Sequence, residues 1–309
     1  MSIYKEYSYA SRDGVTTIKG YSWCPDNGQI RGCVQIVHGM QEYIGRYRDF
    51  IEYLTSKGFL VFGNDMLGHG NSAPNENELG YFCKNDPSTV IVRDAHRLKK
   101  MIQDQHPGVP FYILGHSMGS FLTRKYLTIY GTGIRGAIIC GTGTAPASVT
   151  GIGNFTASLL TLFRGDHHRS KFISNIAFGG YLKRIENPRT PVDWLTKDEA
   201  IVDKYLNDPL CTFMFTTNGF KTLFTLLSFV CKKKNLTTIP KELPIYIIAG
   251  EEDPVGNYGE GPKAVYEQYK ELGIAEVDLK LYPGMRHEIL NEIGKEEVWS
   301  DVAAWLASR

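Results

Sequence analysis

The alternation of polar and apolar residues changes character near residue 32. Before that point, residues 3–9 and 15–23 alternate between the two kinds, and a Ser-Arg-Asp-Gly turn sequence at 11–14 separates them. A period of two puts one side of an extended chain against the protein interior and the other against water. These two segments are therefore predicted to form a β-hairpin.

From Cys33 onward, short apolar runs alternate with longer stretches of helical periodicity. A strand that is apolar throughout is buried on both faces, and a helix after it returns the chain for a parallel neighbour. We therefore predict an α/β fold with a mostly parallel, doubly wound sheet. The apolar runs lie at 33–38, 59–65, 111–115, 136–141, 244–250 and 277–283, and the helical patterns at 46–56, 89–105 and 118–130.

About 100 residues separate the run that ends near Gly143 from the run that begins near Pro244. A connection between neighbouring strands of such a sheet needs far fewer residues. We predict that residues 1–143 and 244–309 form the core and that residues 144–243 form an inserted helical cap. The helical patterns of this cap lie at 155–163, 196–206 and 220–231.

Charge and composition exclude several classes of protein. The 309 residues contain 34 Lys and Arg against 33 Asp and Glu, which leaves a net charge of +1. A protein whose main partner is nucleic acid needs a basic patch, and the charges here are interspersed. With 42% hydrophobic and 22% charged residues, the composition is that of a folded globular protein.

The cysteines and the N-terminal residues suggest a cellular location. The six cysteines include no Cys-x-x-Cys pair, which fits neither a disulfide framework nor a zinc site. The first 14 residues lack the apolar core of a signal peptide. The longest charge-free run, 136–163, is broken by Pro146 and many small polar residues, so it is not predicted to cross a membrane. We expect a cytoplasmic protein with reduced thiols.

The most specific motif is Gly-His-Ser-Met-Gly at 115–119, between an apolar run and a helical pattern. A strand, a sharp turn and a helix are the context that a nucleophile elbow requires. The turn strains the serine backbone, and the two glycines leave room for the neighbouring strand and helix. Ser117 is therefore predicted to be a nucleophile at the start of a helix. The alternative is an ordinary serine in a tight turn.

A serine hydroxyl is a weak nucleophile, so it needs a base, and the base needs a carboxylate that fixes its tautomer. In the chain order Ser, acid, His, the base is expected to be His287, because the other seven histidines precede residue 244. The acid is expected after the apolar run that ends at residue 250, where Glu251, Glu252 and Asp253 compete. Asp253 is favoured because its short side chain is followed by a proline that stiffens the loop.

Acyl transfer develops negative charge on a carbonyl oxygen, and two preorganised N–H donors can stabilise it. One donor is predicted to be the backbone N–H of Met118, directly after the serine. The other is predicted to be Met40, in a loop where Gly39 lets the backbone turn. His38 precedes the serine and is interpreted as a residue that packs and hydrogen-bonds to hold this loop.

Five motifs stand in a fixed order: HGMQEYIGRY (38–47), NDMLGHGNS (64–72), GHSMGS (115–120), GEEDPVG (250–256) and GMRHEILNE (284–292). Together they resemble the monoacylglycerol lipase and lysophospholipase family of α/β-hydrolases, also catalogued as serine aminopeptidase S33-like hydrolases. The resemblance covers nearly the whole chain and includes the cap segment 190–216. It implies an α/β-hydrolase fold.

The resemblance implies an acyl-ester hydrolase with Ser117, Asp253 and His287 as its catalytic triad and the amides of Met40 and Met118 as its oxyanion hole. The expected substrate is a small acyl ester such as a monoacylglycerol or a lysophospholipid. The expected mechanism uses neither a metal nor an organic cofactor. Two positions depart from the family pattern, because many relatives have a glycine in place of Gln41 and a histidine in place of Tyr43.

Within the cap, Phe220, Leu223, Phe224, Leu227 and Val230 fall on one face of a predicted helix. This face either packs against the core or forms a lid wall that accepts an acyl chain and touches lipid aggregates or a membrane surface. Candidate substrate contacts are Leu223, Phe224 and, near the oxyanion loop, Gly39.

Two further motifs are interpreted as structural. The Gly-x-Gly-x-x-Gly pattern at 131–136 follows a helical pattern and precedes an apolar run, the reverse of a dinucleotide-binding site. His167 and His168 are interpreted as part of a solvated cap loop, because adjacent histidines point to different sides and no further ligand is suitably spaced.

Two rival functions stay open at this stage. One is a serine aminopeptidase or amidase that holds a free amine with acidic cap residues. The other is a non-catalytic, ligand-binding protein on a hydrolase scaffold. The acidic candidates for the peptidase are Glu186, Asp193, Asp198, Glu199 and Asp203.

Overall fold

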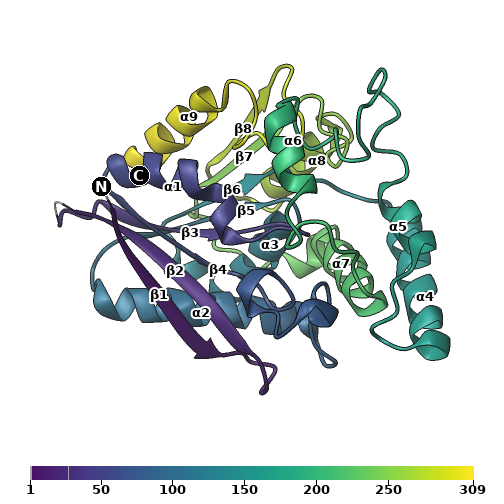
Figure 1. Ribbon diagram of the computed structural model, residues 1–309. Helices are drawn as coiled ribbons and strands as arrows, with labels where there is room; N and C mark the ends of the chain where they lie inside the picture. The colour runs from purple at the N-terminus through teal and green to yellow at the C-terminus, as the bar shows by residue number, and fades with distance from the viewer. Residues whose placement is uncertain (1, 27) are drawn as a thin grey trace.

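The computed structural model describes residues 2–26 and 28–309, and in them eight strands form one sheet with helices on both faces (Figure 1). The strand order is β1-β2-β4-β3-β5-β6-β7-β8. Strand β2 pairs antiparallel with β1 and with β4, and every other neighbouring pair is parallel. The predicted α/β class and the predicted N-terminal hairpin are therefore confirmed.

The strands correspond to the segments that the apolar pattern indicated. Strands β3 to β7 are buried along their whole length, because helices cover both faces of the central sheet. The strands are β1 (Ser2–Ala10), β2 (Thr17–Pro25), β3 (Gly32–Val37), β4 (Phe59–Asn64), β5 (Phe111–His116), β6 (Gly136–Cys140), β7 (Ile245–Gly250) and β8 (Val277–Tyr282).

Alternate residues of each central strand enter two separate hydrophobic clusters. In β3, Val34 and Ile36 belong to the cluster of α1 and α9, whereas Cys33 and Val37 belong to the cluster of α2, α3 and α8. Strict alternation of side chains across a strand explains this division. The helices are α1 (Arg48–Ser56), α2 (Pro87–Gln105), α3 (Met118–Tyr130), α8 (Glu260–Glu271) and α9 (Lys295–Ala307).

Between β6 and β7 the chain forms α4 (Ala147–Arg164), α5 (Lys171–Phe178), α6 (Glu199–Leu206) and α7 (Thr217–Val230). Helix α4 begins well before the predicted start at Phe155, and α5 was not predicted. Gly151 and Gly153 lower the helix propensity of this stretch, so its sequence pattern is weak. Close packing accounts for Gly153, since a Cβ there would lie 2.8 Å from the Phe224 ring of α7.

The inner part of the inserted segment shares the core of the protein. Phe220, Leu226 and Val230 of α7 lie in the same hydrophobic cluster as residues of α2 and α3. The buried Arg124 of α3 donates to the carbonyl oxygens of Val230, at 2.9 Å, and Gly143, at 3.1 Å. Helix α7 is thus fixed to the helix that follows the nucleophile motif, while the division at 144 and 243 stays a prediction.

No helix in residues 2–26 and 28–309 combines the length and the apolar run that a bilayer crossing requires. The six cysteines are free thiols. The glycine pattern at 131–136 ends one helix and begins β6, as expected. Short 3-10 helices occur at η1 (Ile44–Tyr47), η2 (Gly70–Ser72), η3 (Glu76–Glu78), η4 (Gly131–Gly133) and η5 (Lys233–Asn235).

Candidate active site

Four loops at the carboxyl ends of parallel strands carry the residues predicted to do chemistry. Met40 follows β3, Ser117 follows β5, Asp253 follows β7 and His287 follows β8. In an open α/β sheet, the carboxyl ends of parallel strands meet at one edge, where ligands bind. The topology therefore brings residues that are far apart in the sequence to one edge of the sheet (Figure 1).

Ser117 lies in a sharp turn between β5 and α3, with φ of 54° and ψ of −123°. Positive φ is unfavourable for a residue with a side chain, so the turn needs support from its surroundings. The Ser117 N–H donates to the carbonyl oxygen of Cys140 at 3.0 Å, and the Ser117 carbonyl accepts from the N–H of Ser120 at 2.9 Å. This strained, supported turn has the geometry expected of a nucleophile elbow.

The two glycines of the motif are required by close backbone contacts. A Cβ at Gly115 would collide with the backbone oxygen of Gly119, and a Cβ at Gly119 would collide with the backbone oxygen of Val37 in β3. Helix α3 therefore packs closely against the central strands. This close approach explains why the sequence has glycine on both sides of the serine.

His287 and Asp253 form a buried pair. The His287 Nδ1 lies 2.9 Å from the Asp253 Oδ2, and the other carboxylate oxygen accepts the Val255 N–H at 2.8 Å. A carboxylate can only accept, so Nδ1 is the nitrogen that donates, and in the neutral tautomer of this ring the lone pair is on Nε2. Glu251 and Glu252 are exposed, so of the three competing carboxylates Asp253 is the one that contacts the histidine.

The loop after β3 approaches the serine closely. A Cβ at Gly39 would lie 2.9 Å from the Ser117 Cβ. Met40 and Met118 line the same cavity as Ser117, and the Met40 N–H has no partner in residues 2–26 and 28–309. Gly39 does not line this cavity, and its N–H donates to the Glu42 carboxylate. The geometry therefore does not support Gly39 as a direct substrate contact.

His38 holds this loop, as its place in the sequence indicated. Its Nε2 accepts the Met66 N–H at 2.9 Å, and its Nδ1 donates to the Gly39 carbonyl oxygen at 2.8 Å. The ring is fully buried, and burial lowers its pKa, so it stays neutral. The residue therefore joins the loop after β4 to the loop after β3.

The two departures from the family pattern connect this loop to the inserted segment. Gln41 has a φ of 57°, a region that favours glycine, and its amide Nε2 donates to the Phe213 carbonyl oxygen. The Tyr43 hydroxyl donates to the Asp208 carboxylate at 2.9 Å. A glycine at 41 would relieve the backbone but would lose this contact with the inserted segment.

A buried polar network that no sequence pattern indicated lies beside the serine. The Glu42 carboxylate accepts from the Tyr47 hydroxyl at 2.8 Å and from the N–H of Gly39, and it lies 3.1 Å from the His116 Nδ1. The His116 Nε2 lies 3.2 Å from the His287 carbonyl oxygen. The network therefore links the loop after β3 to the loop that carries His287.

The buried carboxylates of this network are paired with cationic side chains. Arg46 pairs with both oxygens of Glu288, at 2.7 and 2.8 Å, and with Glu42 at 3.4 Å. Burial raises the pKa of Glu42, but His116 and Arg46 outweigh it and hold that pKa well below its usual range. Burial lowers the pKa of His116, but Glu42 outweighs it and the pKa is raised. The motif HGMQE contains Glu42, but no sequence pattern indicates its buried partners.

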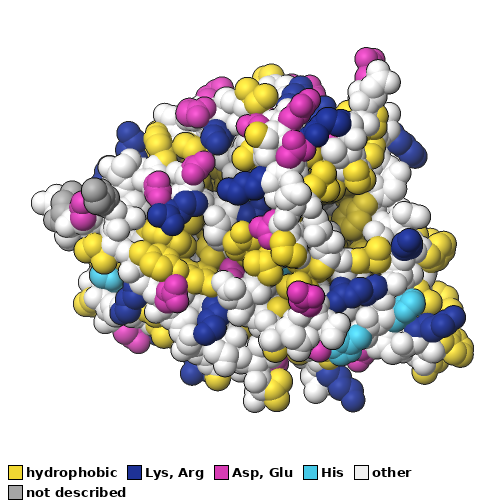
Figure 2. All heavy atoms as spheres, viewed as in Figure 1, with side chains coloured by type: hydrophobic (Ala, Val, Ile, Leu, Met, Phe, Trp, Pro, Cys, Tyr) yellow, Lys and Arg dark blue, Asp and Glu magenta, His cyan; other side chains and the backbone are white. Residues whose placement is uncertain are grey.

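Ser117, His116 and His287 open into a cavity of about 1150 Å³, between the core and the inserted helices. In Figure 2, hydrophobic side chains form the floor of a recess between the regions of α6 and α5. The apolar part of the lining includes Val149, Phe178, Leu223, Phe224 and Leu227, and the polar part includes Glu42, Tyr205, Thr212 and Glu288.

The acidic residues suggested as amine anchors for a peptidase do not line this cavity. Three of them are used in local contacts. Asp193 accepts from the backbone N–H groups of Arg189 and Thr190, Asp198 caps α6, and Asp203 pairs with Arg189 at 2.7 Å. The proposed anchoring of a free amine therefore has no support in the geometry of these residues.

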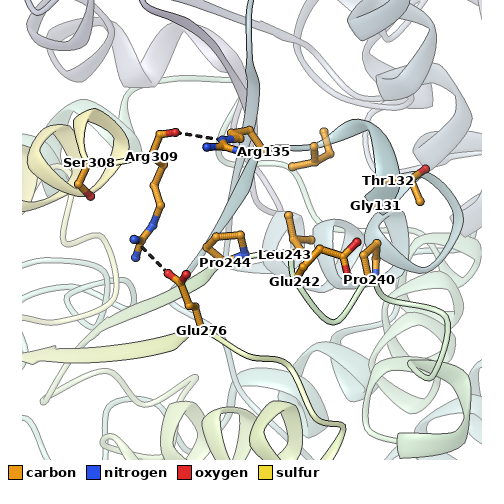
Figure 3. A pocket seen from close by; sticks show the side chains of 11 residues that line it. Gly131, Thr132, Arg135, Pro240, Glu242, Leu243, Pro244, Glu276, Ser308 and Arg309 are labelled. Carbon is orange, nitrogen blue, oxygen red and sulfur yellow. Dashed lines mark hydrogen bonds and ion pairs between the residues drawn. The ribbon is translucent and has the colours of Figure 1, made fainter.

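A second, smaller hollow of about 360 Å³ lies at the opposite edge of the sheet (Figure 3). Arg135, directly before β6, and Arg309, Glu276 and Glu242 contribute to its lining. Two contacts join its charged residues: Arg309 lies 3.0 Å from Glu276, and the Arg135 side chain donates to the main-chain oxygen of Arg309 at 3.0 Å. Four residues of the Gly-x-Gly-x-x-Gly segment line it, namely Gly131, Thr132, Ile134 and Arg135, but none of the residues predicted to do chemistry does.

Comparison with known proteins agrees with this geometry. The model of the serine aminopeptidase S33 family matches residues 28–294. The chain belongs to this family. The resemblance stated from the sequence motifs is therefore confirmed, and the protein is a serine hydrolase with the α/β-hydrolase fold.

Individual members of the family match along nearly the full chain. The monoacylglycerol lipase of Mycolicibacterium smegmatis is 26% identical over 307 residues, which cover 98% of this chain and 97% of that protein. The thermostable carboxyl esterase of Bacillus coagulans, solved in complex with glycerol, is 31% identical with a TM-score of 0.92. The match covers 100% of this chain and 99% of that chain. The monoglyceride lipase of Saccharomyces cerevisiae shares the fold, at 22% identity and a TM-score of 0.76. The match covers 98% of this chain and 94% of that chain.

Proposed function

We propose that this protein hydrolyses carboxylic esters through an acyl-enzyme on Ser117, with Asp253 and His287 as the other members of the triad. The observation that carries the proposal is the buried His287–Asp253 pair, 2.9 Å apart, beside a cavity that Ser117 also lines. A base held in one tautomer next to a strained serine is the arrangement that nucleophilic acyl transfer needs.

The reaction follows from the roles of these groups. The Nε2 of His287 takes the proton of the Ser117 hydroxyl while Oγ attacks the ester carbonyl carbon. The N–H groups of Met40 and Met118 stabilise the tetrahedral oxyanion. His287 then gives the proton to the leaving alcohol as the carbon–oxygen bond breaks, and a water molecule repeats the sequence on the acyl-enzyme. The carboxylic acid leaves and the serine is regenerated.

The substrate class is proposed to be a monoacylglycerol, a lysophospholipid or a similar ester of a long acyl chain. Leu223 and Phe224 belong to the apolar lining and would contact the acyl chain, whereas the polar lining near Glu42 and Glu288 suits an alcohol with hydroxyl groups. The relatives named as monoacylglycerol lipases, and the esterase solved with glycerol, favour the same class.

The test is hydrolysis of p-nitrophenyl esters from acetate to palmitate, beside an amino-acid p-nitroanilide. Wild type is expected to turn over esters faster than the anilide, with an optimum at a chain length that fits the apolar lining. Ser117→Ala is expected to lower kcat by at least about 10³-fold, because it removes the nucleophile. Ser174→Ala is the matched control, since this serine also lines the cavity but lies on α5 of the inserted segment, outside the sharp turn between β5 and α3.

Each contrary result has a definite meaning. Ester turnover that survives Ser117→Ala, or that is lost equally in the control, would contradict the assignment of the nucleophile. Faster turnover of the anilide would favour the peptidase. Failure of Ser117 to react with a fluorophosphonate would favour the non-catalytic binding protein.

We further propose that the outer face of the inserted segment touches lipid aggregates or a membrane surface. Helices α4 and α5 leave an unusual number of large apolar side chains exposed, and Figure 2 shows hydrophobic side chains at the edge where Figure 1 places α4. Such a face next to cationic residues is typical of helices that lie in a lipid interface. The exposed residues that do not line the cavity are Ile152, Phe155, Leu159, Leu162, Phe163 and Phe172.

Sedimentation with vesicles of phosphatidylcholine and phosphatidylglycerol tests this contact. Phe155 and Phe163 are 70% and 73% exposed, and replacing both with Ser is expected to weaken vesicle binding at least about tenfold. Turnover of the water-soluble acetate ester should not change. The matched control replaces Ile3 and Val15, which are 58% and 90% exposed on the N-terminal hairpin, with Ser. Equal losses in the two double variants would refute the role of this face.

We also propose that the protein is located in the cytoplasm. The six cysteines are free, and burial raises the pKa of Cys33 to about 12 and that of Cys83 to about 11. Free thiols of this kind suit a reducing compartment.

A further inference from the structure

Trp194, in the loop between α5 and α6, contacts the predicted catalytic base. The Trp194 and His287 ring centroids are 5.2 Å apart, with the ring planes at 43°. The Tyr181 ring packs edge-on against the Trp194 ring, with the ring centroids 4.9 Å apart. Trp194 also lines the cavity, so one indole touches both the base and the space where a substrate would bind.

The backbone around Trp194 is hydrogen-bonded to the residues on either side of His287. The Arg286 guanidinium donates to the Asp193 carbonyl oxygen at 2.6 Å, and the Glu288 N–H donates to the Leu195 carbonyl oxygen at 2.7 Å. Residues 193 and 195 are thus fixed to residues 286 and 288. This pairing sets the indole of residue 194 directly against the imidazole of residue 287.

Further bonds extend this attachment to both loops of the triad. The buried Glu292 accepts from the Thr196 hydroxyl at 2.7 Å and the Lys197 N–H at 2.8 Å, and it also accepts the Arg286 N–H at 3.1 Å. The Lys197 ammonium pairs with Glu252 at 2.9 Å, next to the aspartate that holds the base. Residues 193–197 therefore contact the loop of the base and the loop of the acid together.

We infer that Trp194 is a positioning residue, through which the 193–197 segment fixes the His287 imidazole for proton transfer and closes it from bulk water. This inference rests on the proposed function. A base acts efficiently only when its nitrogen is held close to the productive position, and supporting side chains supply that restraint. The inserted segment is therefore part of the catalytic apparatus as well as a wall of the substrate cavity.

The experiment compares Trp194→Ala and Trp194→Phe with wild type on p-nitrophenyl acetate, whose acyl group is too small to need the apolar lining. In Trp194→Ala, kcat is expected to fall at least about tenfold, with KM changed less than about twofold, because the base loses its restraint. Trp194→Phe keeps a ring against the imidazole and is expected to restore most of kcat. The rate of Ser117 phosphonylation by a fluorophosphonate, which releases fluoride, should follow the same order.

A spectroscopic signal reports the restraint directly. The proton between His287 Nδ1 and Asp253 gives a far-downfield proton resonance in a triad of this kind. We expect it to broaden or disappear in Trp194→Ala and to return in Trp194→Phe. Circular dichroism and the melting temperature establish that the compared variants are folded.

A second variant, at Arg286, tests the same contact between Trp194 and His287. Arg286→Met removes the guanidinium that donates to the carbonyl oxygens of Asp193, at 2.6 Å, and Thr196, at 3.3 Å. It should lower kcat and the phosphonylation rate in the same direction as Trp194→Ala, without touching the substrate cavity. This variant keeps the test decisive if Trp194→Ala does not fold.

The outcomes separate this inference from the proposed function. An unchanged kcat with a raised KM for long esters would make Trp194 a cavity wall only and would overturn the inference. Equal losses in the Ala and Phe variants, in step with loss of folded protein, would also overturn it. If wild type turns over no ester, the proposed function fails, and the phosphonylation rates still test the positioning role.

Discussion

Asp253→Asn is expected to lower kcat for ester hydrolysis by about 10⁴-fold while leaving the fold intact, because it reverses the tautomer of the base. The Val255 N–H donates to one side-chain oxygen of residue 253 at 2.8 Å, so it would retain the asparagine carbonyl oxygen. The asparagine NH₂ would then face the His287 Nδ1 and donate to it. The ring proton would move to Nε2, which could no longer accept the serine proton.

Steady-state kinetics with the best p-nitrophenyl ester measure this loss, and the melting temperature reports on folding. Glu251→Gln is the matched control, since Glu251 is an exposed carboxylate in the same loop. It should retain full activity. Loss of activity in Glu251→Gln with retention in Asp253→Asn would show that the wrong carboxylate was chosen.

Glu42→Ala is expected to lower the free energy of unfolding by about 3–5 kcal/mol, because it leaves buried partners without their shared carboxylate. The side chains of Arg46, Tyr47 and His116 and the backbone N–H of Gly39 all contact Glu42. Activity should fall as well, because the Glu42 carboxylate holds the loop that carries the Met40 N–H. Denaturant unfolding and ester turnover of the same preparation measure the two effects.

The loss of stability in Glu42→Ala is expected to depend on pH, in a direction set by the pKa shifts of Glu42 and His116. The lowered pKa of Glu42 contributes stability above the ordinary glutamate pKa of about 4.3, and that contribution is lost as pH falls further. The raised pKa of His116 contributes stability below the ordinary histidine pKa of about 6.5, and that contribution is lost as pH rises through the raised value. The difference in stability between wild type and Glu42→Ala should therefore be largest between these limits.

A surface carboxylate supplies the comparison for Glu42. Glu52 pairs with Arg48 on α1, and the side chains are 52% and 61% exposed. Glu52→Ala should cost less than about 1 kcal/mol, because an exposed ion pair is screened by water. A similar small cost for Glu42→Ala, without dependence on pH, would mean that the buried network contributes little to stability.

Much of the core could be predicted because its information is local. Strands β3 to β7 are short apolar runs between helical patterns, and burial on both faces leaves that pattern in the sequence. The turn at Ser117 was also predictable, since the close contacts of Gly115 and Gly119 leave glycine as the residue that fits. Chain order then selected His287 from eight histidines.

The inserted segment was less predictable because tertiary packing overrides its local propensities. Helix α4 contains Gly151 and Gly153 and still forms, with one glycine packed against the Phe224 ring. Segment 193–197 has little regular structure, and its conformation depends on hydrogen bonds to residues about 90 positions away in the chain. Such long-range partners leave no periodic pattern.

The sequence by itself determined the fold class, the order of the chemistry-bearing loops along the chain and the identity of the residues predicted to form the triad. Each of these follows from short-range constraints: apolar runs, a turn that needs glycine, and the order of motifs along the chain. Tertiary structure alone decided that Glu42 and His116 join two loops of the site and that Trp194 packs against His287. Those contacts depend on which side chains meet when distant segments fold together, and a buried charge or ring is placed by its partners rather than by its neighbours in sequence.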